Sequence, residues 1–422
     1  MRIFVKKLWS NEFYKGGLFL TIASFIGNIL NYFFNILVGR TLGPPGFGEI
    51  STLFSYIALT SIPLTILSTI IIQKISSAEE NSFAITRSIE DYFLVKIKRW
   101  FFLIIFLVIF IPFIPQVTNL TLVTSYSLIP FILLSFLTSF YGAALQGLRL
   151  FFLLAIIGLG SSLFKLLGAI LVYAGIDGLT TIISFIFISV LINLLASIYI
   201  IHRNVYRKMP DKFFPKINKR ILHVIREKQF IITTFSIIGI TLFSTIDIVF
   251  VKKFFTAEQA GIYSSWSLFA KLILYVLGPI NSLALVFFSG KKNLTQQDRV
   301  LSITLLVLVF ISFVSFVFYT TFAPFVVNLF FGSKFYAVIP ILGTASIFGF
   351  FFTVISFVNS YFLAKNSYLS LTLAFAMPLY IVFLFILPRE LNAVIQLNII
   401  FFGIVTLLYL FGYFRSKSRS TL

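Results

Sequence analysis

The sequence predicts an all-α polytopic membrane protein, with about 12 transmembrane helices in two pseudo-symmetric six-helix lobes around a central cavity. Hydrophobic residues make up 59 % of the chain and charged residues only 11 %, whereas a soluble domain carries about 25 % charged residues. The apolar residues lie in runs of the length that a membrane-spanning helix requires, about 20 residues. A strongly basic segment at the midpoint separates two apolar halves, which indicates two lobes.

The basic segment, residues 202–229, carries nine Lys or Arg against two acidic residues, Asp211 and Glu227. So dense a positive charge is excluded from hydrocarbon and is poorly translocated beside spanning helices. We therefore expect a cytoplasmic linker between an N-terminal lobe, residues 1–201 with spans one to six, and a C-terminal lobe, residues 230–422 with spans seven to twelve.

Apolar runs bounded by charges and turn residues place the individual spans. In order, the expected spans are residues 17–38, 48–72, 100–118, 122–146, 152–174, 179–201, 230–251, 261–288, 300–322, 338–363, 369–387 and 391–413. The first run follows a basic start and continues to Val38 without a small-residue cleavage site, so we interpret it as a span rather than a signal peptide.

The distribution of positive charge fixes the expected orientation. With the linker in the cytoplasm, the inside segments hold 26 Lys and Arg and the outside segments hold five, in agreement with the positive-inside rule. Both termini are then cytoplasmic. The outside loops are too short for an extracytoplasmic catalytic domain.

Several classes of function are disfavoured by what the sequence lacks. It has no Cys, and its two histidines, His202 and His223, lie in the linker, so the spans carry no thiolate or His-cluster metal site. There is no G-x-x-x-x-G-K-[ST] motif for ATP. The net charge of +20 comes mainly from short loops, so it does not indicate nucleic acid binding. We expect no enzyme activity and no cofactor, and leave open a coupling proton or sodium ion.

An internal repeat joins the first two spans of each lobe. Residues 38–51, VGRTLGPPGFGEIS, align with residues 251–264, VKKFFTAEQAGIYS, at an offset of 213, which matches Gly48 with Gly261 and Arg40 with Lys253. Lobes of like topology related by an axis along the membrane normal are a known transporter plan. The alternative is that two short outside turns converged on similar residues.

Two lysines lie at membrane depth and are predicted to bind substrate, because charges within spans usually face a bundle interior or a wet cavity. Lys271 shares a helix face with Ser264, Ser267, Tyr275, Gly278 and Ser282, and Lys165 with Gly158, Ser161, Ser162, Gly168 and Ala169. Tyr275 is a candidate for stacking on a sugar. A structural or snorkelling lysine is the alternative for each, and Lys165 also has a helix-packing alternative.

Other polar residues in the spans extend the candidate site. The first span carries Asn28, Asn31 and Asn35 on one face, which favours a hydrated surface over lipid contact because carboxamides are costly in hydrocarbon. Asp247, about one turn from the outer end of the seventh span, is a candidate for ion coupling or gating. The favoured interpretation of Asp247 is a structural ion pair, with Arg40, Lys252 or Lys253.

The cations determine the expected charge of the ligand. The polar faces of spans one, seven and eight are expected to meet in a cavity, where Lys271 and Lys165 set a positive potential. A cavity for cationic drugs would carry buried Asp or Glu instead. The charge therefore favours an anionic ligand such as a lipid diphosphate.

Several segments resemble a known family. LVGRTLGPPGFGEISTL (Leu37–Leu53) and STIDIVFVKKFFTAEQAGIYSSWSLFAK (Ser244–Lys271) resemble the first interspan junction of each half in bacterial polysaccharide export proteins. These are the O-antigen and capsule repeat-unit flippases of the multidrug/oligosaccharidyl-lipid/polysaccharide (MOP) exporter superfamily. AALQGLRLF (Ala143–Phe151) and LFFGSKFYAVIPIL (Leu329–Leu342) resemble two of its other loops. The positions that match the family pattern are Arg40, Gly43, Gly48, Asp247, Gly261 and Lys271.

The resemblance implies a MATE-like fold and a flippase that works by alternating access. It would move an undecaprenyl-diphosphate-linked oligosaccharide repeat unit from the inner to the outer leaflet of the bacterial cytoplasmic membrane, for surface polysaccharide assembly. Membrane lipid, a polysaccharide polymerase and other export proteins are the implied partners, and Arg40 joins the predicted substrate-binding residues. The alternatives are an ion-coupled multidrug exporter of the same superfamily, a polysaccharide polymerase or ligase, and an uncoupled lipid scramblase.

Overall fold

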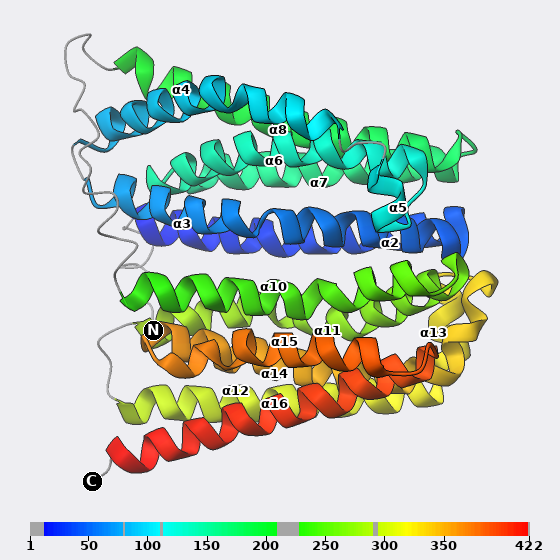
Figure 1. Cartoon of the computed structure of the whole chain (residues 1–422). Helices are drawn as coiled ribbons and strands as arrows, with labels where there is room; N and C mark the ends of the chain where they lie inside the picture. Colours follow the sequence, from blue (N-terminus) through cyan, green and yellow to red (C-terminus); the bar gives the residue numbers. More distant parts are fainter. Residues whose placement is uncertain (1–11, 79–80, 110–112, 209–227, 290–293, 421–422) are drawn as a thin grey trace. The chain divides into compact units, whose positions relative to one another are not determined.

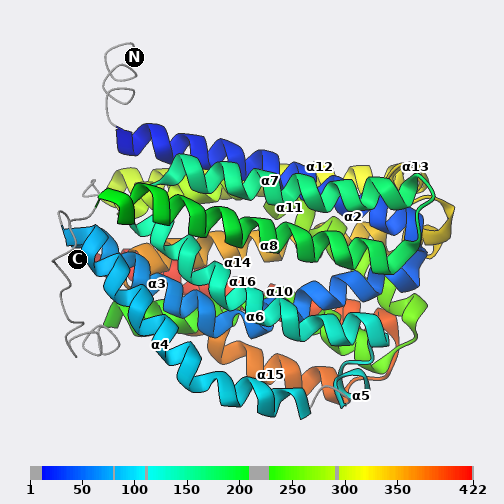
Figure 2. The same ribbon diagram turned by 90° about the horizontal axis from the view of Figure 1, so that it is seen from above.

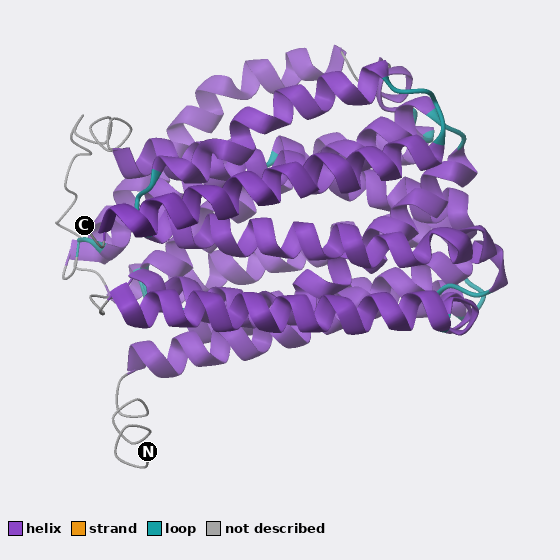
Figure 3. Ribbon diagram, turned by 90° about the horizontal axis from the view of Figure 1, so that it is seen from below, coloured by secondary structure: helices purple, strands orange, loops and turns teal. Residues whose placement is uncertain are grey.

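A computed structural model of the chain describes residues 12–78, 81–109, 113–208, 228–289 and 294–420. All regular structure in these residues is helical (Figures 1 and 3), which confirms the predicted fold class. A segment in hydrocarbon has to satisfy its backbone N–H and C=O groups internally, and a helix does so within a single segment. Nine of the described helices are long and apolar enough to cross a membrane, so the protein is a multi-pass membrane protein.

Helical structure coincides with every predicted span. The N-terminal half contains α2 (Glu12–Thr60), α3 (Ile62–Ser76), α4 (Ser82–Ile109), α5 (Ile114–Thr118), α6 (Leu122–Gly147), α7 (Phe151–Tyr173), α8 (Gly178–Asn204) and the 3-10 turn η3 (Tyr206–Lys208). The C-terminal half contains α10 (Lys228–Phe254), α11 (Ala257–Ser289), α12 (Leu294–Thr321), α13 (Ala323–Phe330), η4 (Ser333–Ile341), α14 (Leu342–Ala364), η5 (Tyr368–Leu371), α15 (Thr372–Ile386) and α16 (Leu391–Ser420).

Helix α2 contains the first predicted span and the start of the second. Gly43 interrupts it with φ 66° and ψ −174°, and Pro44 and Pro45 follow directly. This backbone conformation lies outside the regions open to other residues, so a side chain here would be strained. The Pro ring then pre-sets the φ angle of a new first helical turn.

The chain forms two compact units. The first joins the chain up to Phe34 with Thr60–Arg226, and the second joins Asn35–Leu59 with Glu227–Leu422. These units follow the two halves of the sequence, with Asn35–Leu59 grouped with the C-terminal half. The lobe boundaries at residues 201 and 230 remain a prediction, and most of the predicted linker lies outside the described residues.

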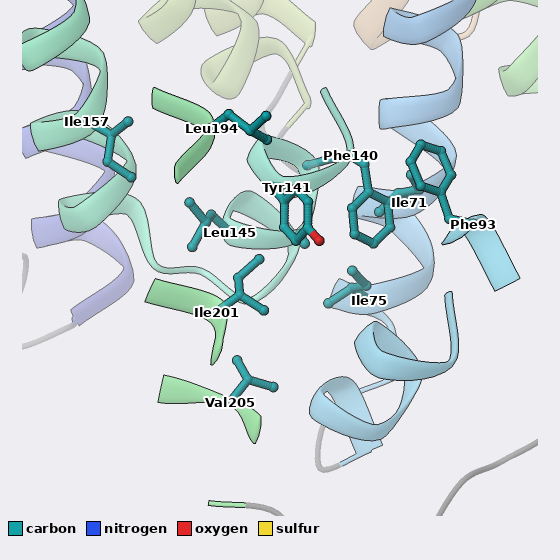
Figure 4. Packing of buried hydrophobic residues seen from close by; sticks show 12 residues of the cluster. Ile71, Ile75, Phe93, Phe140, Tyr141, Leu145, Ile157, Leu194, Ile201 and Val205 are labelled. Atoms are coloured by element: carbon teal, nitrogen blue, oxygen red, sulfur yellow. The ribbon is translucent and has the colours of Figure 1, made fainter. Parts of the chain in front are cut away.

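The core of the first unit is aliphatic and aromatic. Helix α6 packs on α3 and α8, and α8 packs on α7 (Figures 1 and 2). Figure 4 shows the side chains that meet there, with Phe140 and Tyr141 of α6 between Ile71 and Ile75 of α3 on one side and Leu194 of α8 on the other. Adjacent rings extend the cluster to α4, where Phe93 stacks on Phe140 at 4.7 Å between ring centroids.

The second unit is built around α14, which packs on α11, α12 and α16, while α10 packs on α15. Aromatic rings hold these helices together. Phe243 of α10 lies with its ring centroid 4.1 Å from that of Phe402 on α16. Trp266 of α11 stacks on Phe348 of α14 at 5.2 Å and donates its indole N–H to Thr344 Oγ1 at 3.0 Å. The indole therefore buries a large apolar surface without losing its hydrogen bond.

Helix ends use local signals that recur in both halves. After α6, Arg149 adopts φ 60°, and the N–H of Leu150 reaches back to the carbonyl of Leu145. After α14, Asn366 adopts φ 50°, and the N–H of Ser367 reaches the carbonyl of Phe362. This is the same left-handed C-cap with a six-residue hydrogen bond. The turn between spans four and five thus has a counterpart between spans ten and eleven.

Candidate functional site

The first unit holds one of the two predicted lysines in a polar cluster. Lys165 of α7 donates from Nζ to the amide oxygen of Asn31 on α2 at 2.6 Å, and Asn31 Nδ2 lies 3.4 Å from Ser162 Oγ. Gly27, one turn earlier on α2, faces Ser162. The structure therefore brings together Asn31 and Lys165. The amide oxygen of Asn31 that accepts from Lys165 is neutral.

The other two asparagines predicted on the face of the first span belong to different compact units. Asn28 is half-buried in the first unit, and Asn35 is half-buried in the second unit. This face thus crosses the boundary between the units at residue 34. The part of both residues in substrate binding remains a prediction.

The second unit buries Lys271 between its helices. Its side chain is 8 % exposed, and its Nζ donates to the backbone carbonyl of Ser244 on α10 at 2.7 Å. The ammonium group also lies over the ring of Phe352, 5.9 Å from the centroid. Lys271 is close enough to Asp247 to be influenced by its charge. The side chain of Tyr275, one turn further along α11, lies outside the described residues.

Asp247 ends a chain of hydrogen bonds that crosses four helices. Tyr263 Oη on α11 donates to Asp247 Oδ2 at 2.6 Å, and Asn398 Nδ2 on α16 donates to Tyr263 Oη at 2.6 Å. Tyr380 of α15 in turn donates to Asn398 Oδ1. Each donor points toward Asp247, which is the direction that stabilises a negative carboxylate.

Three buried oxygens near these residues in sequence have no hydrogen-bond partner in the part of the chain that the structure describes. They are Asp247 Oδ1, Ser264 Oγ and Ser267 Oγ. Ser264 and Ser267 precede Lys271 by seven and four residues, so they share its helix face. Buried polar atoms normally have partners, so these oxygens mark unsatisfied polar positions on Asp247 and on the helix face of Lys271.

Arg40, which was predicted to bind substrate, contacts the end of α13. Its guanidinium donates to the backbone carbonyls of Asn328, Leu329 and Phe330, at the end of α13. A cation at the C-terminus of a helix satisfies carbonyls that have no partner within the helix and interacts favourably with the helix dipole. This contact is structural, and a substrate-binding role for Arg40 stays a prediction.

Sequence reasoning missed several residues of these clusters. Tyr263, Asn398 and Tyr380 carry the chain that ends at Asp247, and Glu49 pairs with Lys252. Asn398 had a usable signal, since an asparagine within an apolar span is costly unless it faces the bundle interior. Two of the partners expected for Asp247 have other partners: Lys252 forms an ion pair with Glu49, and Arg40 donates hydrogen bonds to the end of α13.

The described residues contain no group of three or more His, Cys, Asp or Glu side chains that is able to hold a metal ion. The candidate site residues are instead the half-buried Lys165 and the buried Lys271 and Asp247, each hydrogen-bonded to a neighbouring helix. That arrangement suits reversible binding of a charged group within a membrane protein, where intramembrane ionisable residues mark substrate and ion pathways.

Solved structures with the same fold are transporters and flippases. A multidrug resistance MATE family transporter of the MOP superfamily, in an inward-facing conformation, aligns with TM-score 0.68 and 14 % identity over 94 % of this chain and 96 % of that chain. The lipid II flippase MurJ, in an inward closed conformation, aligns with TM-score 0.66 and 17 % identity over 94 % and 87 %. A MOP superfamily transporter from Pyrococcus furiosus, described as having a binding pocket of reverse polarity, aligns with TM-score 0.63 and 15 % identity over 97 % of each.

The chain therefore shares its fold with transporters and flippases of the MOP superfamily. A family model described as "Polysaccharide biosynthesis protein" matches residues 13–287, and the chain belongs to this family. The predicted family resemblance is thus confirmed. No curated protein sequence matches the chain.

Proposed function

We propose that the protein flips an undecaprenyl-diphosphate-linked oligosaccharide repeat unit from the inner to the outer leaflet of the bacterial cytoplasmic membrane, for surface polysaccharide assembly. The observation that carries this proposal is the match to the polysaccharide biosynthesis family, because residues 13–287 include both lysines at membrane depth. The shared fold with a lipid II flippase supports lipid-linked substrates as a class.

Lys165 and Lys271 are the proposed contacts for the diphosphate. Each ammonium group is held by a neutral oxygen, from Asn31 or from the backbone of Ser244. A carbonyl or amide oxygen solvates an ammonium without cancelling its charge, so each site retains an attraction for phosphate in a medium of low dielectric constant.

The test combines export in cells with lipid flipping by the purified protein in vesicles. Lys165→Met and Lys271→Ala should each reduce delivery of a lipid-diphosphate glycan to the outer leaflet by at least about tenfold, the size expected when a charge-assisted contact is lost. Lys334→Ala is the matched control, because Lys334 is an exposed cation of the second unit. Normal flipping by both lysine variants at wild-type protein levels would remove the site assignment.

An ion-coupled multidrug exporter is the second candidate, favoured by the shared fold with a MATE transporter and by the buried carboxylate of Asp247. We assign Asp247 to ion coupling or gating under either function, with a proton or sodium ion as the ligand. Resistance to cationic dyes that is lost in Asp247→Asn, together with no effect on surface polysaccharide, would favour the drug exporter.

The proposed orientation places the linker and both termini in the cytoplasm, and a polysaccharide polymerase and other export proteins remain proposed partners. Alkaline phosphatase fused after residue 215 should be inactive, because the enzyme folds only outside the cytoplasm, and a fusion after residue 255 should be active. The reverse pattern would invert the orientation.

A further inference from the structure

The segment Asn35–Leu59, which we call the tongue, belongs to the second compact unit although the chain on either side of it belongs to the first. The first unit's chain enters the tongue at Asn35 and leaves it at Leu59. Any displacement between the units during transport therefore has to bend the tongue or to release it from its partners. The contacts that fasten the tongue decide which of these happens.

The first fastening is a close backbone contact between the two repeat-related segments. A Cβ atom added to Gly48 would lie 2.8 Å from the backbone nitrogen of Gly261, and one added to Gly261 would overlap the carbonyl of Pro44. Only glycine permits this approach. This backbone contact positions the tongue, but it involves no charged group and so gives no preference for two distinct states.

The second fastening is aromatic and polar. The ring centroid of Phe47 lies 5.2 Å from that of Phe331 and 6.0 Å from that of Phe335, and Arg40 holds the carbonyl end of α13. The Arg40 contacts with Asn328 and Leu329 are open to solvent. Water can therefore replace these hydrogen bonds at little cost when the tongue moves.

The third fastening is an ion pair inside this contact region. Glu49 Oε2 and Lys252 Nζ lie 2.6 Å apart, and their side chains are only 3 % and 5 % exposed. Separating a buried pair takes each charge away from its opposite charge before water reaches it, so the pair favours either a fully closed or a fully hydrated arrangement over any intermediate. This is the property of a two-state element.

We propose that the Glu49–Lys252 ion pair is a latch that holds the tongue on the second unit and opens in each transport cycle. The proposal rests on the proposed flippase function and on the expected position of residues 39–47 and 252–260 outside the membrane. In the closed state the pair is dry and short, and in the open state both charges face water.

The absence of cysteine from the sequence makes a direct cross-linking test available. Glu49→Cys/Lys252→Cys, cross-linked by a short bifunctional methanethiosulfonate that binds both thiols through disulfide bonds, should export at least about tenfold less glycan than the same variant before cross-linking, and should regain that export when the disulfide bonds are reduced. Lys228→Cys/Tyr368→Cys is the matched control, because these side chains are also in contact within the second unit, with the ammonium 4.2 Å from the ring centroid. Normal export by the cross-linked latch variant would overturn the proposal.

A second measurement separates the latch from the transport function. Spin labels at the exposed positions Pro45→Cys, in the tongue, and Glu390→Cys, after α15, report release of the tongue in the purified protein without substrate. Glu49→Gln should raise the population of longer distances at least about tenfold, and Glu49→Lys/Lys252→Glu should return it toward the wild-type value. Unchanged distances in Glu49→Gln would refute the latch even if the wild-type protein exports glycan. A distance change without any glycan export would refute the flippase function and leave the latch standing.

Discussion

Tyr263→Phe tests whether the hydrogen-bond chain that ends at Asp247 stabilises the second unit. Tyr263 is fully buried, and the substitution keeps its ring, which lies 5.4 Å from that of Trp266 between centroids. Only the hydroxyl is lost. The change removes the 2.6 Å bond to Asp247 and the 2.6 Å bond from Asn398, and it leaves both buried partners unsatisfied.

The expected loss follows from these two bonds. A neutral hydrogen bond between membrane helices contributes about 0.6 kcal/mol on average, and about 1.7 kcal/mol at most. A bond to a carboxylate is roughly twice as strong as a neutral one, and a buried group left without a partner costs about 1–3 kcal/mol. Tyr263→Phe should therefore lower the free energy of unfolding by about 2–4 kcal/mol.

Tyr319→Phe supplies the control. Tyr319 is also buried in the second unit, but its hydroxyl makes one long bond, 3.3 Å, to the carbonyl of Phe269. Its loss should cost about 0.5 kcal/mol. Denaturant unfolding of the two purified variants in one detergent compares them directly. If the two variants have equal free energies of unfolding, the hydrogen bonds that end at Asp247 add no stability beyond packing. The hydrogen bonds would then not stabilise the negative charge of Asp247 as inferred here.

Three further predictions concern a close backbone contact, a helix end and a buried carboxyl group. Gly261→Ala should sharply lower the amount of folded protein in membranes, because the new methyl group overlaps the carbonyl of Pro44. Gly158→Ala is the control and should be tolerated, because its methyl group would meet open space. Equal amounts of the two variants in membranes would contradict the close contact at Gly261. Arg40→Met should lower the free energy of unfolding by only about 0.3–1 kcal/mol, because water can replace the guanidinium at the exposed carbonyls of Asn328 and Leu329. A loss of about 3 kcal/mol or more would show that water does not replace these hydrogen bonds. Burial raises the pKa of Glu90, although two tyrosine hydroxyls donate hydrogen bonds to its carboxyl group. The contribution of Glu90 to stability is therefore present below the pKa of the unfolded state, about 4.3, and is lost as the pH rises through the pKa of the folded state. Glu90→Gln keeps a hydrogen-bond acceptor without the charge, so it should remove the loss of stability at higher pH. If the stability of Glu90→Gln depends on pH between 4 and 8 as that of the wild type does, this role of Glu90 is wrong.

Local information in the sequence was enough for the class of fold and the positions of the spans. Each apolar run has to satisfy its own backbone hydrogen bonds in hydrocarbon, so the helix is decided within about 20 residues and needs no distant partner. Turn residues acted locally as well. Gly43 with Pro44 ends one helical segment and begins the next, and the Thr256–Gln259 pair caps α11 with reciprocal hydrogen bonds.

The partners of the buried polar residues were decided only by the tertiary structure. The sequence placed Lys165, Lys271 and Asp247 on polar helix faces, but a face does not specify which helix it meets. Lys165 and Asn31 are 134 residues apart, and Asn398 and Tyr263 are 135 apart. The pairing of Lys252 with Glu49 rather than Asp247 depends on where the tongue packs. Hydrophobicity acts on each segment alone and specifies the helices, whereas a buried charge responds to whichever oxygens the packed helices bring within about 3 Å.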